Sequence, residues 1–298
     1  MVVALALAPS PVAAQAFTLP QGVGAVTLAW QYVDNTGHRL SDGFLVERGQ
    51  SVTMSADFEL DYGVTDRLSA TFGIPYVFAK YTGGLPPPSN LPVDSCRCWH
   101  STFQDFSLAA RYHLGDDRWA VTPLVRYTRP SHDYRYQGEA VVGRDLQEGQ
   151  IGFNLGARLV GFLPRASLQA GYTYAFVEKV LKIPLNRSNA FIDLGYALTR
   201  RLYVHGNGLW QHTHGGLRFG SPTGNPFFPP GELNTPERFA QRDRLLRVNN
   251  WKVGGGLAYS ASPVVDVFAA FTKFVSGTDS HNGQAYTVGA TWYFGLPH

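Results

Sequence analysis

Long segments of this sequence alternate between apolar and polar residues. Between Val52 and Tyr62 every second residue is apolar, and the positions between them include Asp57, Glu59 and Asp61. After a short turn the same alternation resumes. A period of two places alternate side chains on opposite faces of a β-strand. The chain is therefore predicted to form β-sheet that has one apolar face and one polar face.

Segments of this kind recur along the whole chain. Most have about 9–11 residues, the length that a tilted strand needs to cross a bilayer, whereas strands of globular proteins usually have about 5–6. The 32 glycines and 19 prolines favour many turns over a helical fold. The predicted strands cover residues 24–33, 50–62, 68–80, 103–114, 119–128, 149–161, 166–177, 189–199, 201–212, 250–259, 264–275 and 284–294.

Short turns and long loops alternate between these segments. The short turns are residues 64–67, 115–118, 163–165, 199–201 and 260–263, and the long loops are residues 34–49, 81–102, 129–148, 178–188, 213–249 and 276–283. Short periplasmic turns, long external loops and an even number of strands are typical of bacterial outer-membrane barrels. We therefore predict an all-β fold, a transmembrane antiparallel β-barrel of about 12 strands in the bacterial outer membrane. The alternative is a soluble, lipocalin-like barrel with its aromatic side chains inside.

Composition excludes other classes of protein. Charged residues make up 16% of the chain and the formal net charge is +3, without a basic stripe that interleaves with aromatic residues. Nucleic-acid binding is therefore not expected. No segment approaches the roughly 20 consecutive apolar residues that a membrane-spanning helix needs.

The N-terminal segment MVVALALAPSPVAAQAF resembles an export signal. Its short apolar run is followed by Ala14, Gln15 and Ala16, the A-x-A form of a signal-peptidase site. We predict that residues 1–16 form a signal peptide and that residues 17–298 form a single barrel domain. Export would place the two cysteines where disulfides can form.

Two stretches carry a resemblance to a known family. GVTDRLSATFGIPYVF, from Gly63, and NWKVGGGLAYSASPVVDVFAAFTKFVSGTDSHNGQAYTVGATWYF, from Asn250, resemble the outer-membrane transporter-like proteins named for the meta-pathway of phenol degradation. The resemblance implies a β-barrel and an uptake role for small, often aromatic or hydrophobic compounds. It implies no particular binding residue. One departure is that residues 295–298 follow Phe294, the aromatic residue that ends the last strand.

If the apolar faces contact lipid, charged residues on the opposite faces line the lumen. Acid on one wall and base on another would set a transverse field that tunes the permeation of polar solutes. In the other interpretation, these groups pair with one another and plug the lumen. The predicted lumenal residues are Asp57, Glu59, Asp61, Arg111, Arg126, Arg158, Asp193 and His205.

The long loop 213–249 is a second candidate site. Thr235 and Pro236 have the types expected at the cap and first turn of a short helix. In one interpretation the loop is a lid that uses Phe227, Phe228, Arg238, Arg242 and Arg244, its arginines facing an anionic group. In the other interpretation it is an outer helix whose arginines contact lipopolysaccharide phosphates.

The stretch DSCRCWH is a third candidate. Cys96, Cys98 and His100 have the types of soft metal ligands, but no fourth ligand accompanies them. A disulfide that staples the loop is the preferred interpretation, so no metal or other cofactor is predicted.

Catalysis needs a nucleophile beside a positioned base. His212 and His214 share a strand face, without a serine between or beside them, and zincin and nucleotide-binding signatures are absent. Two other serine–histidine pairs are adjacent in sequence, a spacing that places their side chains on opposite faces of a strand. They are His100–Ser101 and Ser131–His132. The prediction is therefore a non-enzyme.

The resulting prediction is an outer-membrane, porin-like channel for passive uptake of small molecules. Its expected partners are outer-membrane lipid, lipopolysaccharide and the permeating solute. The main alternative is a plugged barrel that docks another envelope or extracellular protein, and a lipid-modifying enzyme is a third.

Overall fold

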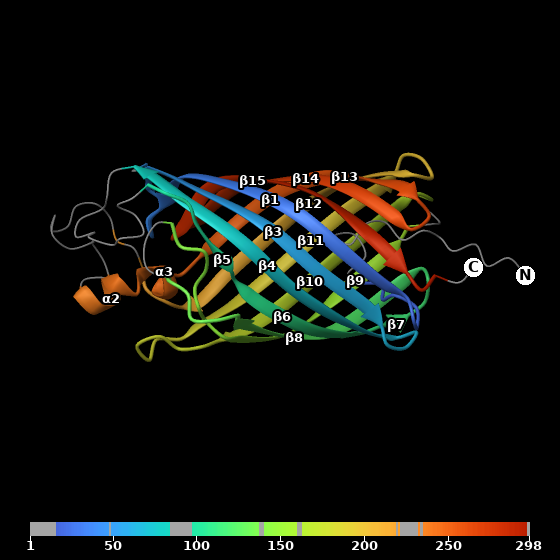
Figure 1. Cartoon of the computed structure of the whole chain (residues 1–298), viewed down its shortest axis with the longest axis horizontal. Helices are drawn as coiled ribbons and strands as arrows, with labels where there is room; N and C mark the ends of the chain where they lie inside the picture. Colours follow the sequence, from blue (N-terminus) through green and yellow to red (C-terminus); the bar gives the residue numbers. More distant parts are fainter. Residues whose placement is uncertain are drawn as a thin grey trace, which may run out of the picture.

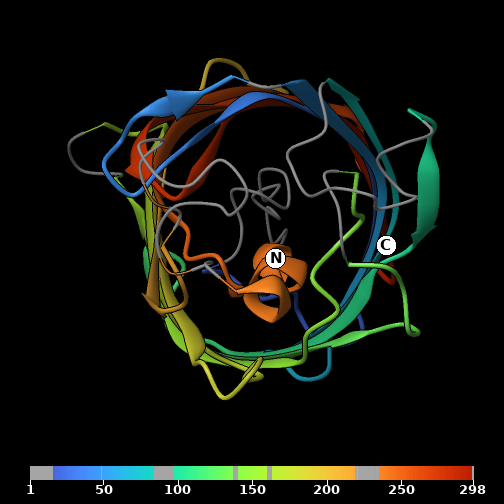
Figure 2. The ribbon, with the colours of Figure 1, turned by 90° about the vertical axis from the view of Figure 1, so that its left-hand side faces the viewer.

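The protein is a closed antiparallel β-barrel (Figures 1 and 2). The computed structural model describes residues 16–47, 49–83, 97–136, 140–159, 163–218, 220, 232 and 235–296. The barrel has 12 strands, each hydrogen-bonded to the strands that precede and follow it in the chain. The last strand pairs with the first from Gly24–Phe294 to Arg39–Ser280, so the sheet has no free edge. The predicted fold class is confirmed.

The strands have the following bounds. Ten cross the barrel as single segments: β1 (Gly24–Arg39), β3 (Gly49–Gly63), β4 (Leu68–Gly83), β8 (Trp119–Pro130), β9 (Glu148–Arg158), β10 (Ala166–Val177), β11 (Leu185–Ala197), β12 (Leu202–Gly215), β13 (Asn249–Ser262) and β14 (Val265–Thr278). An eleventh single segment is β15 (Ser280–Phe294). The remaining strand is divided into β5 (His100–Phe103), β6 (Asp105–Tyr112) and β7 (Leu114–Gly115). The short β2 (Leu45–Val46) pairs with the end of β1.

Large apolar side chains cover the outside of the barrel. Leu28 on β1 is 60% exposed and Val288 on β15 is 55% exposed. Both alternate with inward-facing residues such as Thr27 and Thr291, whose hydroxyl groups hydrogen-bond to each other at 2.9 Å. An apolar exterior around a polar interior is stable in hydrocarbon, because the closed ring satisfies every backbone hydrogen bond within itself. The chain is therefore an outer-membrane barrel, and Met54, Phe58 and Leu60 belong to its lipid-facing surface.

The strands extend further at the long-loop end than the alternation predicts. β1 continues to Arg39, and only Asp279 separates β14 from β15. The prediction of a long loop over residues 276–283 is therefore wrong. Beyond the hydrocarbon layer both faces of a strand meet water, so the outward positions there no longer need to be apolar. The strand continues although its sequence pattern ends.

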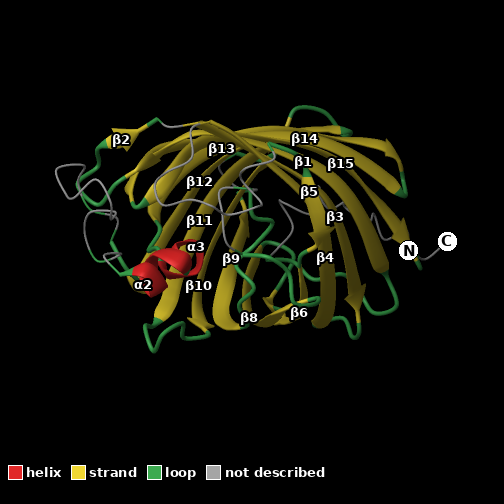
Figure 3. Cartoon of the chain, turned by 60° about the vertical axis from the view of Figure 1, so that its left-hand side comes forward, coloured by secondary structure: helices red, strands yellow, loops and turns green. Residues whose placement is uncertain are grey.

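Two short helices lie at the same end of the barrel (Figures 1 and 3). They are α2 (Pro236–Ala240) and α3 (Arg242–Leu245). The Thr235 hydroxyl accepts a hydrogen bond from the backbone N–H of Arg238 at 3.3 Å, which is the predicted N-cap. No helix in the described part of the chain is both long enough and apolar enough to span a membrane.

Candidate functional site: the barrel lumen

An acidic wall and a basic side chain meet in the half of the lumen nearer the short turns. The Arg111 guanidinium on β6 forms an ion pair with the Asp61 carboxylate on β3, across the intervening strand β4. Thr71 on β4 donates its hydroxyl to the same carboxylate at 3.1 Å. Nearby, Asp57 accepts a hydrogen bond from the Ser55 hydroxyl at 3.1 Å. Two of the predicted lumenal charges, Asp61 and Arg111, therefore neutralise each other.

Arg126 on β8 has a different environment. It lies between Val125 and Tyr127, which are exposed on the outer surface, and so it points into the lumen. It is nevertheless exposed to solvent, and its charge acts on the Glu59 carboxyl of β3, three strand positions away in the sheet. An inward-facing side chain can be exposed only where the interior contains water. At this depth no side chain in the described part of the chain covers the Arg126 guanidinium.

Asp193 and His205 form a buried pair on neighbouring strands. The Asp193 carboxylate lies 2.6 Å from Nδ1 of His205, and the two side chains are 3% and 6% exposed. The Tyr203 ring stacks on His205 with the ring centres 6.2 Å apart, and its hydroxyl hydrogen-bonds to Ser167 at 2.8 Å. These two predicted lumenal residues therefore belong to a packed section of the wall, unlike Arg126.

The segment that precedes β1 occupies the lumen near the short turns. Ala16 is fully buried and its backbone N–H donates to the Gln169 side chain at 3.3 Å. The Thr122 hydroxyl donates to the Ala16 carbonyl. The Phe17 ring lies 5.1 Å from the Arg158 guanidinium carbon. Arg158, a predicted lumenal residue, thus holds this segment and does not face open water alone.

A second ion pair lies towards the opposite end of the lumen. Glu148 on β9 pairs with Arg187 on β11, with β10 between them. The Gln150 amide also donates to Glu148 at 2.6 Å. Sequence analysis missed this pair because residues 148 and 187 fall in predicted loops, where alternation assigns no face.

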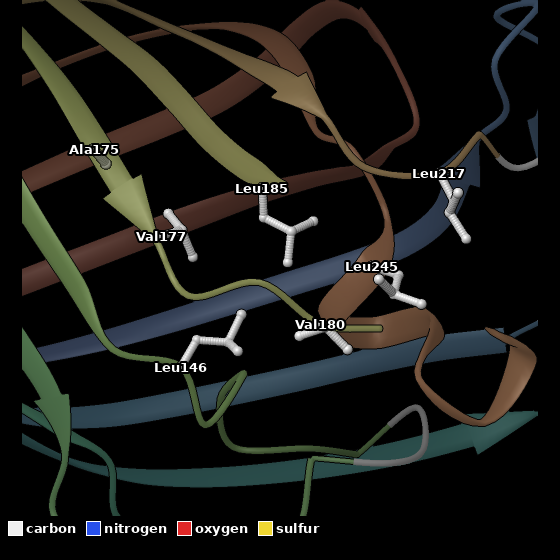
Figure 4. Close-up of a cluster of buried hydrophobic side chains, with 7 residues drawn as sticks. All are labelled: Leu146, Ala175, Val177, Val180, Leu185, Leu217 and Leu245. Carbon is white, nitrogen blue, oxygen red and sulfur yellow. The ribbon is translucent and has the colours of Figure 1, made fainter. Parts of the chain in front are cut away.

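Apolar side chains fasten the helical loop to the wall (Figure 4). Leu245 at the end of α3 is fully buried, in a cluster with Val177 of β10 and Leu185 of β11. Leu146, from the loop between β8 and β9, joins the same cluster. The other members are Ala175, Val180 and Leu217. Two external loops therefore fold inward over the mouth of the barrel (Figure 2).

Polar contacts join these two loops to each other. The Arg244 guanidinium carbon lies 4.1 Å from the centre of the Tyr136 ring, and Arg244 also donates to the Asp145 carbonyl at 2.5 Å. The Gln241 amide donates to the Tyr136 hydroxyl at 3.1 Å. We call residues 131–147 and 235–248, where described, the lid.

The predicted arginines of the helical loop serve the lid itself. Arg242 is 3% exposed and lies over the Phe239 ring at 4.6 Å, and Arg238 donates to the Glu232 carbonyl at 3.1 Å. The helix is thus folded inward, as in the lid interpretation, but these arginines bind neighbouring groups of the protein. Phe227 and Phe228 lie outside the described residues.

The cysteine-containing stretch offers no metal centre in the described part of the chain. Cys98 is disulfide-bonded, as the loop-staple interpretation expects, so its sulfur is not a thiolate ligand. His100 lies 3.6 Å from that sulfur through Nε2. Cys96 lies outside the described residues. No group of three or more potential metal-binding side chains occurs among those described.

The structure creates one serine–histidine contact that the sequence pattern does not reveal. On the outer surface, Ser188 of β11 lies 2.7 Å from Nε2 of His214 on β12, so His214 does have a serine partner, from the neighbouring strand. Ser188 is only 3% exposed because the Tyr172 hydroxyl, 2.8 Å away, and His214 cover it. A nucleophile must reach its substrate. This arrangement is therefore a hydrogen-bonded network and not an accessible catalytic dyad.

The adjacent residues Ser131 and His132 also contact each other, contrary to the expectation from their spacing. The Ser131 hydroxyl lies 2.9 Å from Nδ1 of His132. They follow β8 and lie outside any strand, so the alternation of faces does not apply. The same hydroxyl is 3.1 Å from the Phe103 carbonyl, to which it donates. A serine that donates to a carbonyl is not activated by the imidazole.

Comparison with known proteins identifies the fold. No family model matches the sequence, and no curated protein matches it. The structure is similar to the COG4313 outer-membrane channel from Pseudomonas putida F1, with a TM-score of 0.71, 12% identity, and coverage of 94% of this chain and 98% of that chain. It is also similar to the β domain of the Bordetella autotransporter BrkA (TM-score 0.52, 13% identity, 92% and 100% coverage). The NanC porin gives a TM-score of 0.50 at 9% identity, with 90% and 98% coverage.

These neighbours are a channel, a porin and the β domain of an autotransporter. Proteins of one fold can carry unrelated functions, so function depends on what the lumen of this chain contains.

Proposed function

We propose that this protein is a selective outer-membrane channel for the passive uptake of small molecules, including aromatic or hydrophobic ones. The closed barrel provides the path, and its lumen provides charged groups of both signs. The resemblance to transporter-like proteins of phenol degradation agrees with this proposal. The family assignment itself stays a prediction.

The observation that carries the proposal is the exposure of Arg126 on the inner face of β8. A plugged barrel would bury this guanidinium. Instead it borders an aqueous space, and its charge acts on the Glu59 carboxyl of β3, three strand positions away in the sheet. A solute that passes this depth crosses a field between a cation and a carboxylate, which favours polar or dipolar molecules of suitable orientation.

Two constrictions explain why the channel would be selective. At one end the Phe17 ring lies in the lumen, 5.1 Å from the Arg158 guanidinium carbon. At the other end the lid covers part of the mouth. A general porin presents a wide aqueous passage. This barrel instead admits solutes only past two segments of its own chain.

The docking alternative places function on the external loops. It is favoured by the basic and aromatic side chains of the lid. Those side chains are however bound within the lid, as Arg242 and Arg244 illustrate. The channel proposal needs no partner and uses groups that are exposed in the lumen.

Single-channel recording in planar bilayers tests the proposal. Purified barrel should produce stepwise currents, and replacing Arg126 with glutamine should change the reversal potential in a salt gradient. A matched control is Arg129→Gln, because Arg129 lies on the same strand but on the outer surface. A barrel that inserts without producing current, under conditions where a known porin conducts, would contradict the proposal.

A further inference from the structure

Two cationic side chains lie on the inner wall at the level of one aromatic residue, Phe274. Lys252 on β13 is paired in register with Phe274 on β14. On the other side of β14, with β15 between, the Arg39 guanidinium carbon of β1 lies 5.8 Å from the centre of the Phe274 ring. Phe274 is only 5% exposed. The consecutive strands β13 and β14 and the distant strand β1 thus each contribute a residue to one section of the wall.

Lys252 points into the lumen because its neighbours Trp251 and Val253 are 53% and 51% exposed on the outer surface. Among the residues that the structure describes, the Lys252 ammonium has no hydrogen-bond or ion-pair partner. A charge that leaves bulk water without a partner is costly. A site that carries such a charge is predisposed to bind an anion.

Arg39 adds a second incompletely satisfied cation. Its Nη1 donates to the Gly43 carbonyl at 2.9 Å. Its Nε is buried and makes no hydrogen bond within the described chain. A guanidinium has five N–H donors in a fixed plane, so a carboxylate can use donors that the protein leaves open.

Arg144, from the lid, brings a third positive charge towards this wall. Together with Lys252 it acts on the imidazole of His281, which is itself paired across strands with His38 at a ring separation of 5.1 Å. Burial, and then the neighbouring Arg187 guanidinium, lower the pKa of Arg144 to about 10, so it remains protonated at neutral pH.

The acidic groups of this region are already engaged. Glu148 binds Arg187 and the Gln150 amide. Asp243 and Asp279 each interact with another group of the protein. The acids therefore leave the positive charge of Lys252 uncompensated.

From this juxtaposition we propose that Lys252, Arg39 and Phe274 form a binding site for the carboxylate of a small organic acid that has an apolar or aromatic body. The carboxylate would face Lys252 and the open donors of Arg39, and the apolar body would lie in the lumen beneath the apolar cluster of the lid. This inference rests on the proposed channel function and adds the class of solute. It predicts discrimination between an acid and its uncharged alcohol.

The experiment uses benzoate and benzyl alcohol as probes, which differ in charge but little in shape. Benzoate added on the lid side should reduce the single-channel current of the wild-type barrel, and benzyl alcohol at the same concentration should not. Lys252→Met should raise the benzoate concentration that gives half-maximal block by about tenfold, which corresponds to about 1.4 kcal/mol. Lys252→Arg should retain most of the block.

Lys273→Met is the matched control. Lys273 precedes Phe274 on β14 and is exposed on the outer surface at the same height, so its removal changes total charge equally without touching the lumen. Equal block of the wild type and Lys252→Met would overturn the inference, as would equal block by benzyl alcohol.

A second measurement separates this inference from the channel proposal. Benzoate should raise the unfolding temperature of the detergent-solubilised wild type and of Lys273→Met, but not of Lys252→Met. If the barrel carries no current yet shows this difference, the site stands and the channel proposal fails. If the barrel conducts and benzoate neither blocks nor stabilises it, the site is wrong and the channel proposal stands.

Discussion

Arg111 on β6 and Asp61 on β3 are ion-paired across the intervening strand β4, inside a lumen that is otherwise lined by acids on this wall. Their side chains are 12% and 19% exposed, so the pair is only partly screened by water. Arg111 therefore compensates the carboxylates that a permeating ion meets at this depth. The electrostatics of this half of the passage therefore depend in part on this contact.

Replacing Arg111 with glutamine should shift the channel towards cation selectivity, because Asp61 then adds an uncompensated negative charge to those of Asp57 and Glu59. The expected result is a several-fold rise in the permeability ratio of K⁺ to Cl⁻, read from the reversal potential in a KCl gradient. The double variant Arg111→Gln/Asp61→Asn should return towards the wild-type value. An unchanged reversal potential in the single variant would remove Arg111 from the ion path.

Phe17 should act as an obstruction in the lumen. The variant Phe17→Ala removes the ring that lies 5.1 Å from Arg158, a cation–π contact that is worth about 0.5–1 kcal/mol at exposed sites. The conductance of single channels should rise, and Phe17→Tyr should conduct like the wild type because it retains the ring. A conductance that is equal in all three proteins would mean that the current passes elsewhere.

The Asp193–His205 pair should contribute to the stability of the barrel. Asp193→Ala leaves the His205 imidazole buried without its 2.6 Å partner, and breaking such a pair costs about 3–5 kcal/mol when it is charged. The Asp193→Ala variant should unfold in detergent at a lower temperature than the wild type. The shift of the folded band on a gel measures this unfolding. Asp57→Ala is the comparison, since Asp57 has one hydrogen bond from Ser55 and should change stability much less.

The lid should loosen when Leu245 is truncated. Leu245 is fully buried, and Leu→Ala substitutions at such positions cost about 2–5 kcal/mol. Trypsin should then cleave after Arg242 and Arg244 faster than in the wild type, and the open-channel current should become noisier. Leu257→Ala is the control, because Leu257 is 46% exposed on the lipid-facing surface. Resistance to trypsin equal to that of the wild type would show that the cluster does not hold the lid.

Because the exterior is apolar, a charge introduced on the outward face of a strand should destabilise the barrel much more than one introduced on the inward face. Leu28→Arg places a charge in the lipid-facing surface and should destabilise the folded barrel by about 2–4 kcal/mol in lipid vesicles if that position lies near the midplane. Gln31→Arg, on the same strand but facing the lumen beside Thr287, should be tolerated. The free energy of unfolding in denaturant measures both. Equal costs would contradict the assignment of faces.

The strands and the alternation of their faces could be predicted from the sequence, because they depend on neighbours one or two residues apart. Most of the short and long connections followed, but the loop predicted over residues 276–283 is strand except at Asp279. The even number of strands permits antiparallel closure, whereas the pairing of Gly24 with Phe294 is seen only in the structure. The cap of α2 by Thr235 was also readable, since it depends on residues only three positions apart.

Which polar groups meet is visible only in the folded barrel. The register between strands brings together Glu148 with Arg187 and Ser188 with His214, and it places Lys252 and Arg39 near Phe274. A sequence pattern does not encode register across loops. The tertiary structure also determines that Phe17 lies in the lumen and that Leu245 folds inward, because both depend on side chains elsewhere that bury them. The period of a single strand predicts which of its side chains face the lumen. A binding site depends in addition on the distances between side chains of several strands.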